Sequence, residues 1–460
     1  MKSRIAEALD APEDRQTLFQ RHAEFYNPGF IRLMNMVNFG KYFVRAEGCH
    51  LFDDEGNDYL DFLSGYGSIS FGHNPPRIWK AIEEVASRKM PNFFHLSPVR
   101  LAGILAEKLV KLVGFQNGNT IYANSGAEAV EAAMRLARAA TGKPGFISIK
   151  GCHHGLTYGP LSLRPTGLSE AFAPLLPNCR QIPMNDIEAL EREMAKGDVA
   201  AVVLEPTQGA GGVKSLTLEF VRAVRELCNK HKAVMIMDEI QTGLGRMGYL
   251  FAFQKWGIFP DVVTLGKALS GGCIPIAVAV AEARWWKKAF GPLERCLAEI
   301  TTFGGSTIAC AAAFEALEMA SDKTFLEEVV RKGGLLGTGL ERLRSAHRIV
   351  KDVRGEGLLW GLELKSPEGP LLGPGGEGKL GKLVKQMVGH WPVLCLMNDH
   401  RIISDVCALD ATVMRIQPPL IVEDDEIARF LTALDAVLSQ HPTPASLIRP
   451  CIWEFAKSLF

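Results

Sequence analysis

AVMIMDEIQTGLGRMG, at residues 233–248, and DVVTLGKALSGG, at residues 261–272, are the two stretches that decide the fold. Each opens with a short apolar run typical of a buried strand and continues into small residues rich in glycine. Asp238 ends the first apolar run, and Lys267 follows the second. Ligands of open α/β sheets bind at the carboxyl ends of the strands, so we expect both side chains to face such a site.

Similar apolar runs alternate with helical patterns through the middle of the chain. The strand candidates are Thr120–Ala123, Gly145–Lys150, Ala200–Leu204, Ala233–Asp238 and Val262–Leu265. Short buried strands separated by helices predict an α/β fold whose central sheet is mostly parallel and is covered on both faces.

The two ends of the chain have a different pattern. Residues 1–35 are interpreted as an amphipathic helical leader, and the turn signal at residues 53–56 predicts a small hairpin. A helix is predicted near Lys323–Ala346, and the helices and strands after about residue 330 surround a Gly/Pro-rich loop at residues 366–378, as in an α+β module. The predicted segments are residues 1–76, which join the small domain, a large domain at 77–330, and a C-terminal small domain at 331–460.

The composition argues against several classes of function. Lys and Arg together number 51, as do Asp and Glu, so the formal net charge is zero. Proteins that bind nucleic acid or anionic lipid usually have a basic surplus, so we expect neither partner. The ten cysteines form no CxxC pair and no cluster with metal-ligand spacing, which is typical of thiols in a reducing compartment. No signal peptide or membrane-length apolar run is evident, and we expect a cytoplasmic protein without a metal site.

Lys267 and Asp238 together indicate a cofactor chemistry. A desolvated lysine amine forms a Schiff base with an aldehyde, and Gly266, Gly271 and Gly272 leave room for a bulky group on its nitrogen. Pyridoxal phosphate is such an aldehyde, and its ring becomes an electron sink when a carboxylate faces the pyridine nitrogen. Either residue alone could be a turn cap or a surface lysine, but the pair at the ends of two strands favours pyridoxal phosphate.

A phosphate site is predicted at the start of the helical pattern in IYANSGAEAVEAAMRLAR, residues 121–138. Backbone N–H groups at a helix N-terminus attract a phosphate. Gly126 allows close approach, and Ser125 offers its hydroxyl. On its own the same pattern describes a well-capped helix.

The chain resembles the class III aminotransferases (ornithine/GABA/putrescine type) of the fold-type I pyridoxal phosphate enzymes, and in appearance it is nearest to the putrescine type. The likeness runs from about Phe39 to Leu420. The stretches that carry it are EGCHLFDDEGNDYLDFLSGYGSISFGHNPP, NSGAEAVEAAMRLAR, HHGLTYG, VVLEPTQGAGGV, DEIQTGLGRMG, LGKALSGG, TTFGGSTIACAAA and MRIQPPL. It implies an α/β fold with a mostly parallel central sheet flanked by helices, and a smaller α+β domain built from the N- and C-terminal segments.

The resemblance also implies roles around the cofactor ring. Lys267 would hold pyridoxal phosphate as a Schiff base and then move the proton between substrate and cofactor carbons. Asp238 would pair with the pyridinium nitrogen, and Gln241 would bond the phenolic oxygen. Glu205 would support the ring edge. His153 stands where the family usually has a Tyr or Phe stacked on the ring, and its smaller imidazole leaves the stacking role open.

The same likeness implies a shared phosphate site. Gly126 and Ala127 would supply backbone amides to the phosphate, with Ser125 beside them. Thr302 would reach the phosphate from the neighbouring subunit. The resemblance therefore implies a homodimer with shared sites.

Departures from the family pattern bear on the substrate. Arg415 matches the arginine that binds an amino-acid or oxo-acid carboxylate, and Tyr66 falls where relatives place an aromatic ring against the substrate. Ala210 replaces a glutamate that covers this arginine in many relatives, and Leu156 replaces an arginine that reads a second carboxylate in ornithine- and GABA-type enzymes. An apolar wall at Leu156 suits a methylene chain. We therefore predict ping-pong transamination from a primary amine (a diamine, ω-amino or amino-aldehyde donor) to a 2-oxo acid.

Other readings of the site stay open. A different residue could supply the missing charge, which would make the donor an ornithine- or acetylornithine-type ω-amino acid. An aminomutase of the glutamate-1-semialdehyde type, or a decarboxylating dialkylglycine enzyme, would share Lys267 and Asp238. An inert homologue has no physical need for these two residues with Gln241 and Thr302. A dinucleotide oxidoreductase is disfavoured because no GxGxxG opens the first strand–helix unit.

Three further residues are interpreted as structural. Glu239 is expected to brace its turn by pairing with a basic neighbour such as Arg246. His95 is expected to be a half-buried histidine outside the site, and Cys273 a packing residue, since no base is evident beside it.

Overall fold

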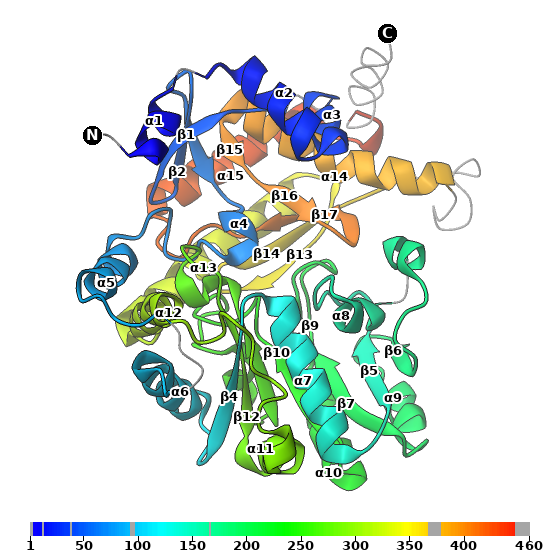
Figure 1. Ribbon diagram of the computed structural model, residues 1–460. Helices are drawn as coiled ribbons and strands as arrows, with labels where there is room; N and C mark the ends of the chain where they lie inside the picture. The colour runs from blue at the N-terminus through cyan, green and yellow to red at the C-terminus, as the bar shows by residue number, and fades with distance from the viewer. Residues whose placement is uncertain are drawn as a thin grey trace.

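The computed structural model describes residues 3–11, 13–36, 39–92, 97–164, 167–366 and 379–446. In Figure 1, a large sheet with its helices lies below two small sheets and the terminal helices. His95, the loop after Ser366 and the end of the chain after residue 446 lie outside the described residues. None of the described helices is long and apolar enough to cross a membrane.

The central sheet has seven strands and is mostly parallel, which confirms the predicted fold class. Its order is β4 (Gly118–Ala123), β12 (Ala277–Glu282), β11 (Val262–Leu265), β10 (Val234–Asp238), β7 (Val199–Leu204), β5 (Gly145–Ile149) and β6 (Cys179–Ile182). Only β12 runs against its neighbours β4 and β11. All five predicted strands are present. β6 and β12 are absent from the sequence prediction, because β6 has few apolar residues and β12 follows β11 without a long helix between them.

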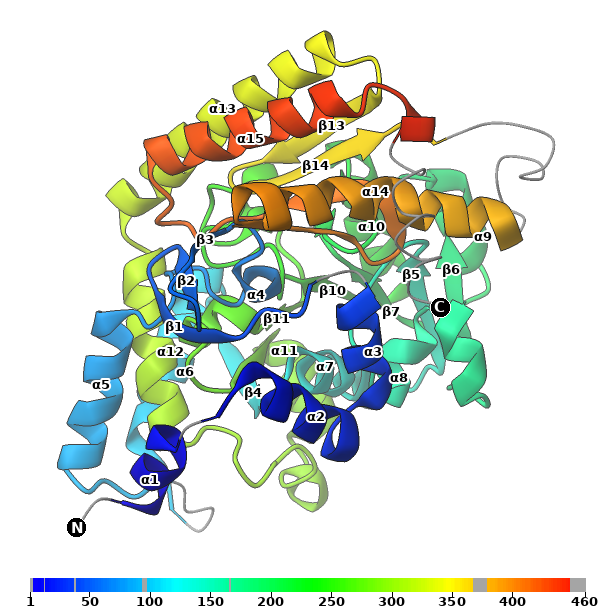
Figure 2. The ribbon, with the colours of Figure 1, turned by 90° about the horizontal axis from the view of Figure 1, so that it is seen from above.

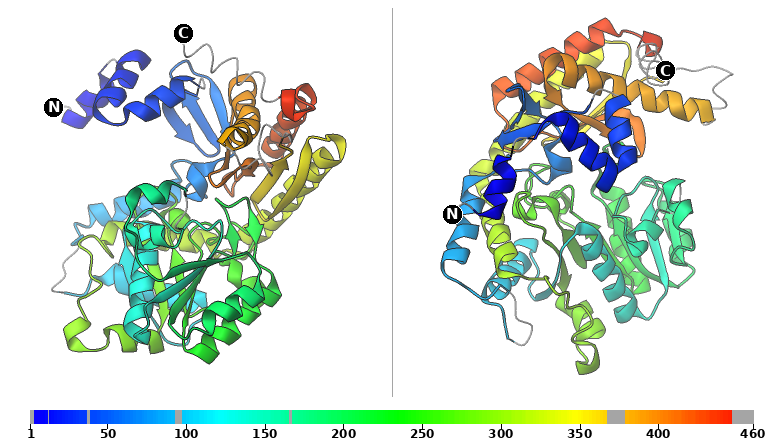
Figure 3. Two further views of the ribbon diagram at one scale, coloured as in Figure 1. Left: turned by 90° about the vertical axis from the view of Figure 1, so that its right-hand side faces the viewer. Right: turned by 45° about the horizontal axis from the view of Figure 1, so that its top comes forward.

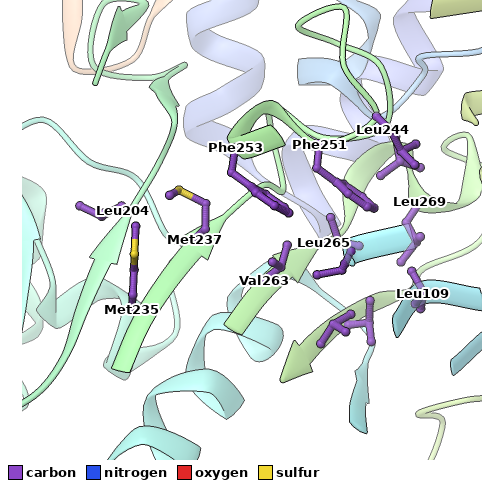
Figure 4. Packing of buried hydrophobic residues seen from close by; sticks show 14 of the residues in the cluster. Leu109, Leu204, Met235, Met237, Leu244, Phe251, Phe253, Val263, Leu265 and Leu269 are labelled. Carbon is purple, nitrogen blue, oxygen red and sulfur yellow. The ribbon is translucent and has the colours of Figure 1, made fainter. Parts of the chain in front are cut away.

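The central sheet is buried on both faces because its strands alternate between two cores. Met235 and Met237 face one core, whereas Val234 and Ile236 face the other. Figure 4 shows the first core, where Met237 lies beside Phe253 and Leu265 beside Phe251. The helices of the first core are α6 (Arg100–Val113), α9 (Ile187–Met194), α10 (Leu218–His231) and α12 (Thr307–Ala320), and those of the second are α7 (Gly126–Thr141) and α11 (Ala283–Phe290). Full burial of each such side chain contributes roughly 1.5–3 kcal/mol.

Two four-stranded sheets in the upper part combine both ends of the chain. One has the order β1 (Phe43–Glu47), β2 (His50–Asp53), β3 (Asp58–Asp61) and β15 (Ile402–Ile403); the other has the order β13 (Val350–Glu356), β14 (Leu359–Leu364), β17 (Asp410–Ile416) and β16 (Asp405–Cys407). β2 and β3 form the predicted hairpin. Asp53 holds its turn by accepting the N–H groups of Glu55 and Asn57. Phe62 and Phe430 stack with ring centroids 4.1 Å apart, so the first sheet shares a core with the C-terminal helix α15 (Asp424–Gln440).

The upper part also contains the helices α1 (Arg4–Asp10), α2 (Arg15–Phe25), α3 (Pro28–Met36), α13 (Lys323–Ala346) and α14 (Lys379–His400). A further helix, α5 (Pro76–Ser87), packs against α12 instead, and its Ile78 belongs to the first core of the large sheet. The predicted helix at residues 323–346 has these bounds because the Asp322 side chain accepts the N–H of Phe325 and caps its start. Seen from above in Figure 2, α13 and α15 lie side by side along β13 and β14. The left view in Figure 3, seen from the side, shows the two small sheets and the terminal helices above the large sheet with its helices.

Candidate active site

Lys267 begins a short 3₁₀ turn (Lys267–Ser270) directly beyond the carboxyl end of β11. Its φ is 46°, a left-handed conformation that costs a non-glycine residue roughly 1 kcal/mol or more. The amine donates a hydrogen bond to Oε1 of Gln241. Burial, aided by the positive charge of Arg415, lowers the pKa of Lys267 to about 8. More of this amine is therefore neutral and nucleophilic at neutral pH than in an ordinary lysine.

Asp238 ends β10, one strand away from Lys267, and its carboxylate is held by three groups. Oδ1 accepts the hydroxyl of Thr264 at 3.1 Å and the N–H of Ile240 at 3.1 Å. Oδ2 lies 2.7 Å from Nδ1 of His154. Thr264 stands opposite Asp238 in the parallel pairing of β10 and β11. The carboxylate is thus buried, fixed in orientation and available to a cationic ring nitrogen.

His154 is a site residue that the sequence analysis does not identify. Burial opposes its charge, but the neighbouring Cys152 sulfur and the hydrogen-bonded Asp238 carboxylate raise the pKa of His154 well above its ordinary value. Its Nε2 is buried without a partner among the described residues. The adjacent histidines could have indicated this role in the sequence. Neighbouring side chains of an extended segment point to opposite sides, so if His153 faces the cofactor ring, His154 faces the groups behind it.

His153 and Glu205 are in contact with each other, next to His154 and Asp238. The N–H of His153 donates to Oε1 of Glu205 at 2.8 Å. Burial lowers the pKa of His153 to about 4, with help from the positive charges of Arg164 and Lys267, so its ring is neutral above that pH. Burial raises the pKa of Glu205 to about 7, and the charge of Asp238 adds to this rise. A flat, neutral imidazole is compatible with stacking on an aromatic cofactor.

The start of α7 has the features expected of a phosphate site. The Ser125 hydroxyl accepts the N–H of Glu128 at 3.2 Å and caps the helix. A Cβ on Gly126 would come within 2.9 Å of Ile240, in the turn that follows Asp238. A Cβ on Gly155 would come within 2.4 Å of the Ala127 side chain. The helix N-terminus, whose first N–H groups have no intrahelical acceptors, is therefore packed tightly beside the turn after Asp238.

Arg415 and Tyr66 form the opposite side of the site, on the small-sheet part of the molecule. Arg415 lies in β17 and is 3% exposed. Its Nη1 donates to the carbonyl of Gly209 at 3.4 Å, whereas Nε and Nη2 have no hydrogen-bond partner in the described part of the chain. The Tyr66 ring covers the guanidinium, with 4.9 Å between Cζ and the ring centroid. Buried guanidinium N–H groups without partners can bind a carboxylate.

Gln241 joins the two sides. Its Nε2 donates to Oε1 of Gln417 at 2.8 Å and to the carbonyl of Tyr66 at 3.2 Å, while its Oε1 receives the Lys267 amine. Gln417 directly follows β17, the strand that carries Arg415, so Gln241 links the lysine to the arginine side. Distant segments thus place the lysine, the carboxylate and the arginine around one site.

Three other predicted positions are Leu156, Thr302 and Ala210. Leu156 is 69% exposed in this chain, and Thr302 is exposed on the segment before α12. Ala210 is buried, and its carbonyl accepts the N–H of Leu409 at 3.0 Å.

The predicted pairing of Glu239 with Arg246 is wrong. Glu239 does brace its turn, but it accepts the N–H of Phe253 at 2.8 Å and the hydroxyl of Thr242 at 2.5 Å. Burial raises the pKa of Glu239 to about 7, so a neutral hydrogen-bonded form becomes accessible there without a cation. Arg246 instead donates to the carbonyls of Leu358 and Pro418.

Comparison with known proteins agrees with this geometry. Residues 35–438 match the family described as aminotransferase class-III. The chain is 33% identical to the aminotransferase PigE of Serratia sp. over 93% of its own length, but it spans only 54% of PigE. It is 36% identical to the acetylornithine aminotransferase of Caldanaerobacter subterraneus, over 86% of this chain and 94% of that protein. It is 33% identical to the putrescine aminotransferase of Pectobacterium atrosepticum, over 94% of this chain and 91% of that protein.

A solved structure gives the same picture. The ornithine aminotransferase of Toxoplasma gondii superposes with a TM-score of 0.82 at 26% identity, covering 95% of this chain and 99% of that one. The reactive amine, the fixed carboxylate and the glycine-lined helix start all fit pyridoxal phosphate, the cofactor of this family. The chain belongs to the class III aminotransferases, enzymes that depend on pyridoxal phosphate.

Proposed function

We propose that this enzyme transfers the amino group of a diamine, or of a related ω-amino or amino-aldehyde donor, to a 2-oxo acid. The observation that carries the proposal is the asymmetry of the site. Arg415 offers unpartnered donors to one carboxylate, while position 156, where ornithine- and GABA-type relatives have an arginine, holds an exposed leucine. An oxo acid satisfies the first feature, and the methylene chain of a diamine packs against the second.

The residues of the chain divide the work as follows. When bound, pyridoxal phosphate supplies a protonated ring that withdraws electrons from the substrate carbon. We assign Lys267 to holding the cofactor and to carrying a proton on Nζ from the substrate carbon. Asp238, aligned by Thr264 and His154, is assigned to the ring nitrogen, whose protonated form it would stabilise.

Other side chains position the cofactor. Gln241 is assigned to its phenolic oxygen, and His153 to its ring face. Glu205 supports the ring edge through the backbone of His153. Ser125, Gly126 and Ala127 bind the phosphate at the start of α7.

We also propose a homodimer in which Thr302 completes the partner's phosphate site. The apolar side chains of Leu297, Ile300 and Phe303 around Thr302 are 50–71% exposed in the single chain, which supports a covered surface there. Sedimentation of the active enzyme at the mass of one chain would contradict this. No disulfide joins the described cysteines, and we propose a cytoplasmic location on this ground.

The absorbance of the holoenzyme near roughly 420 nm, where the lysine-bound cofactor absorbs, tests the function. Putrescine is expected to bleach the band, and 2-oxoglutarate or pyruvate to restore it. Bleaching by ornithine or N-acetylornithine alone would overturn the donor assignment in favour of the second candidate, which the acetylornithine and ornithine enzymes among the relatives support. Turnover without any added oxo acid would indicate an aminomutase instead.

A further inference from the structure

Asp405 is the cross-strand neighbour of the arginine that faces the oxo acid. β16 and β17 pair antiparallel, with Asp405 directly opposite Arg415. On the other side of β17, Arg415 stands opposite Gly361, which has no side chain. Directly opposed residues have Cβ atoms roughly 5 Å apart, so the carboxylate and the guanidinium share one face of the sheet.

The two charged groups are near each other but are not hydrogen-bonded. Oδ2 of Asp405 lies 3.8 Å from Nη2 of Arg415. Oδ1 accepts the N–H of Val406 at 2.7 Å, which holds the carboxylate on this face. A small shift of Oδ2 would satisfy the buried Nη2, which has no other partner among the described residues.

Tyr66 completes the arrangement. Its ring lies over the guanidinium, and burial together with the charge of Asp405 raises the pKa of its hydroxyl. The Arg415 side chain is 4% exposed, whereas that of Asp405 is 27% exposed. The carboxylate can therefore stay hydrated when it leaves the arginine, while the arginine cannot.

Two successive substrates place opposite demands on this arginine. A 2-oxo acid brings a carboxylate to Arg415, but an amine donor that lacks one beside its reacting carbon leaves a buried cation without a counter-ion. An uncompensated buried charge is strongly unfavourable. The side chain at position 210 is a methyl group, and within the described part of the chain the main-chain acceptor of Arg415 is the Gly209 carbonyl.

We propose that Asp405 is the counter-charge of Arg415 while the amine donor occupies the site, and that it yields the guanidinium to the carboxylate of the oxo acid. Asp405 thereby lets one pocket accept two substrates of different charge. This inference deepens the proposed function and rests on the assignment of Arg415 to the oxo acid.

Asp405→Asn is the decisive variant, because the amide oxygen can still accept the Val406 N–H while the charge is lost. Asp410→Asn is the matched control. Asp410 begins β17, the strand that carries Arg415, but its carboxylate pairs with Lys214 at 3.6 Å and accepts the Thr412 hydroxyl. Each half-reaction is followed separately by the cofactor absorbance of the holoenzyme in single turnovers. Affinity for glutarate, a dicarboxylate that cannot react, is measured by calorimetry.

Asp405→Asn is expected to slow the amine half-reaction about tenfold and to bind glutarate several-fold more tightly, while Asp410→Asn matches the wild type. Adding Arg415→Met should abolish the gain in glutarate affinity. Equal slowing of both half-reactions, or behaviour identical to Asp410→Asn, would overturn the proposal.

The donor used is whichever amine bleaches the wild-type enzyme. If that donor is ornithine rather than a diamine, the donor assignment of the proposed function fails, while the same comparison of half-reactions still decides the role of Asp405.

Discussion

The two sides of the active site differ in how far the chain itself satisfies their polar groups. On the large-sheet side, Asp238 has three partners within 3.1 Å. On the small-sheet side, Arg415 has one weak hydrogen bond at 3.4 Å and two buried nitrogens without partners among the described residues. The first side is organised before any ligand arrives, and the second keeps its donors for the ligand. We infer that the cofactor side sets the chemistry and the arginine side sets the choice of substrate.

A second buried arginine makes the same point. Arg246 is 1% exposed, yet it donates to the carbonyls of Leu358 and Pro418 and to the hydroxyl of Ser70 at 2.5–3.1 Å. It joins the turn after β10 to the small-sheet part of the molecule. Both terminal nitrogens of Arg246 have partners, and its Nε alone has none among the described residues, so this arginine supports the fold. In Arg415 both Nε and the terminal Nη2 are open, which leaves them available to a substrate.

The largest effect is expected from Lys267→Ala. Loss of the amine to which we assign the proton transfer should slow the amine half-reaction by at least ~10³-fold. Single turnovers with the best amine donor measure this. Lys255→Ala is the control, because Lys255 pairs with Glu356 at 2.7 Å and has no place in the site. Retention of more than a tenth of the wild-type rate by Lys267→Ala would contradict the assignment.

The second-largest effect is expected from Arg415→Met. It removes the group assigned to the oxo-acid carboxylate, and loss of a buried charge partner typically costs roughly 2–5 kcal/mol, or about 30- to 5,000-fold. The apparent second-order rate of the 2-oxoglutarate half-reaction should fall by this factor. The free energy of unfolding should stay level or rise, because an apolar side chain replaces a poorly satisfied cation.

The same substitution at the other arginine is the control. Arg246→Met leaves the Leu358 and Pro418 carbonyls without their donor and should lower the free energy of unfolding by roughly 3 kcal/mol in denaturant titrations. Equal destabilisation by both variants would break the distinction between a satisfied and an unsatisfied arginine.

The smallest effect is a pH dependence that links the two sides. Only the neutral amine of Lys267 attacks the cofactor aldehyde, and its lowered pKa of about 8 means that protonation suppresses the reaction below that pH. Uptake of pyridoxal phosphate by the cofactor-free protein should accelerate about tenfold per pH unit up to this value and then level off. Since the charge of Arg415 contributes to the lowering, Arg415→Met should move the plateau to higher pH. A rate still rising near pH 10, as for an ordinary lysine at about 10.4, would contradict the lowered pKa.

Parts of the fold could be predicted because their signals are local. The apolar runs that end at Asp238 and Leu265 are the strands β10 and β11, and the helix at residues 323–346 begins at its aspartate cap. β12 could not be predicted in the same way, because its antiparallel place between β11 and β4 depends on pairing with β4, which is distant in sequence.

The site shows the same division. The positions of Lys267 and Asp238 follow from the parallel sheet, whose strand ends meet at one edge. The contact of His154 with Asp238 joins residues 84 positions apart, and the wrong pairing of Glu239 with Arg246 came from their nearness in sequence. Arg246 is instead drawn to carbonyls more than 100 residues away.

The sequence by itself therefore determined the fold family, the cofactor and the two residues at the strand ends, because short motifs encode strand, turn and reactive group together. Only the tertiary structure decided which groups surround them. The lowered pKa of Lys267, the open donors of Arg415 and the placement of Asp405 opposite it all depend on burial and strand register. Burial and register arise when segments distant in the chain pack together, and a single linear motif does not record them.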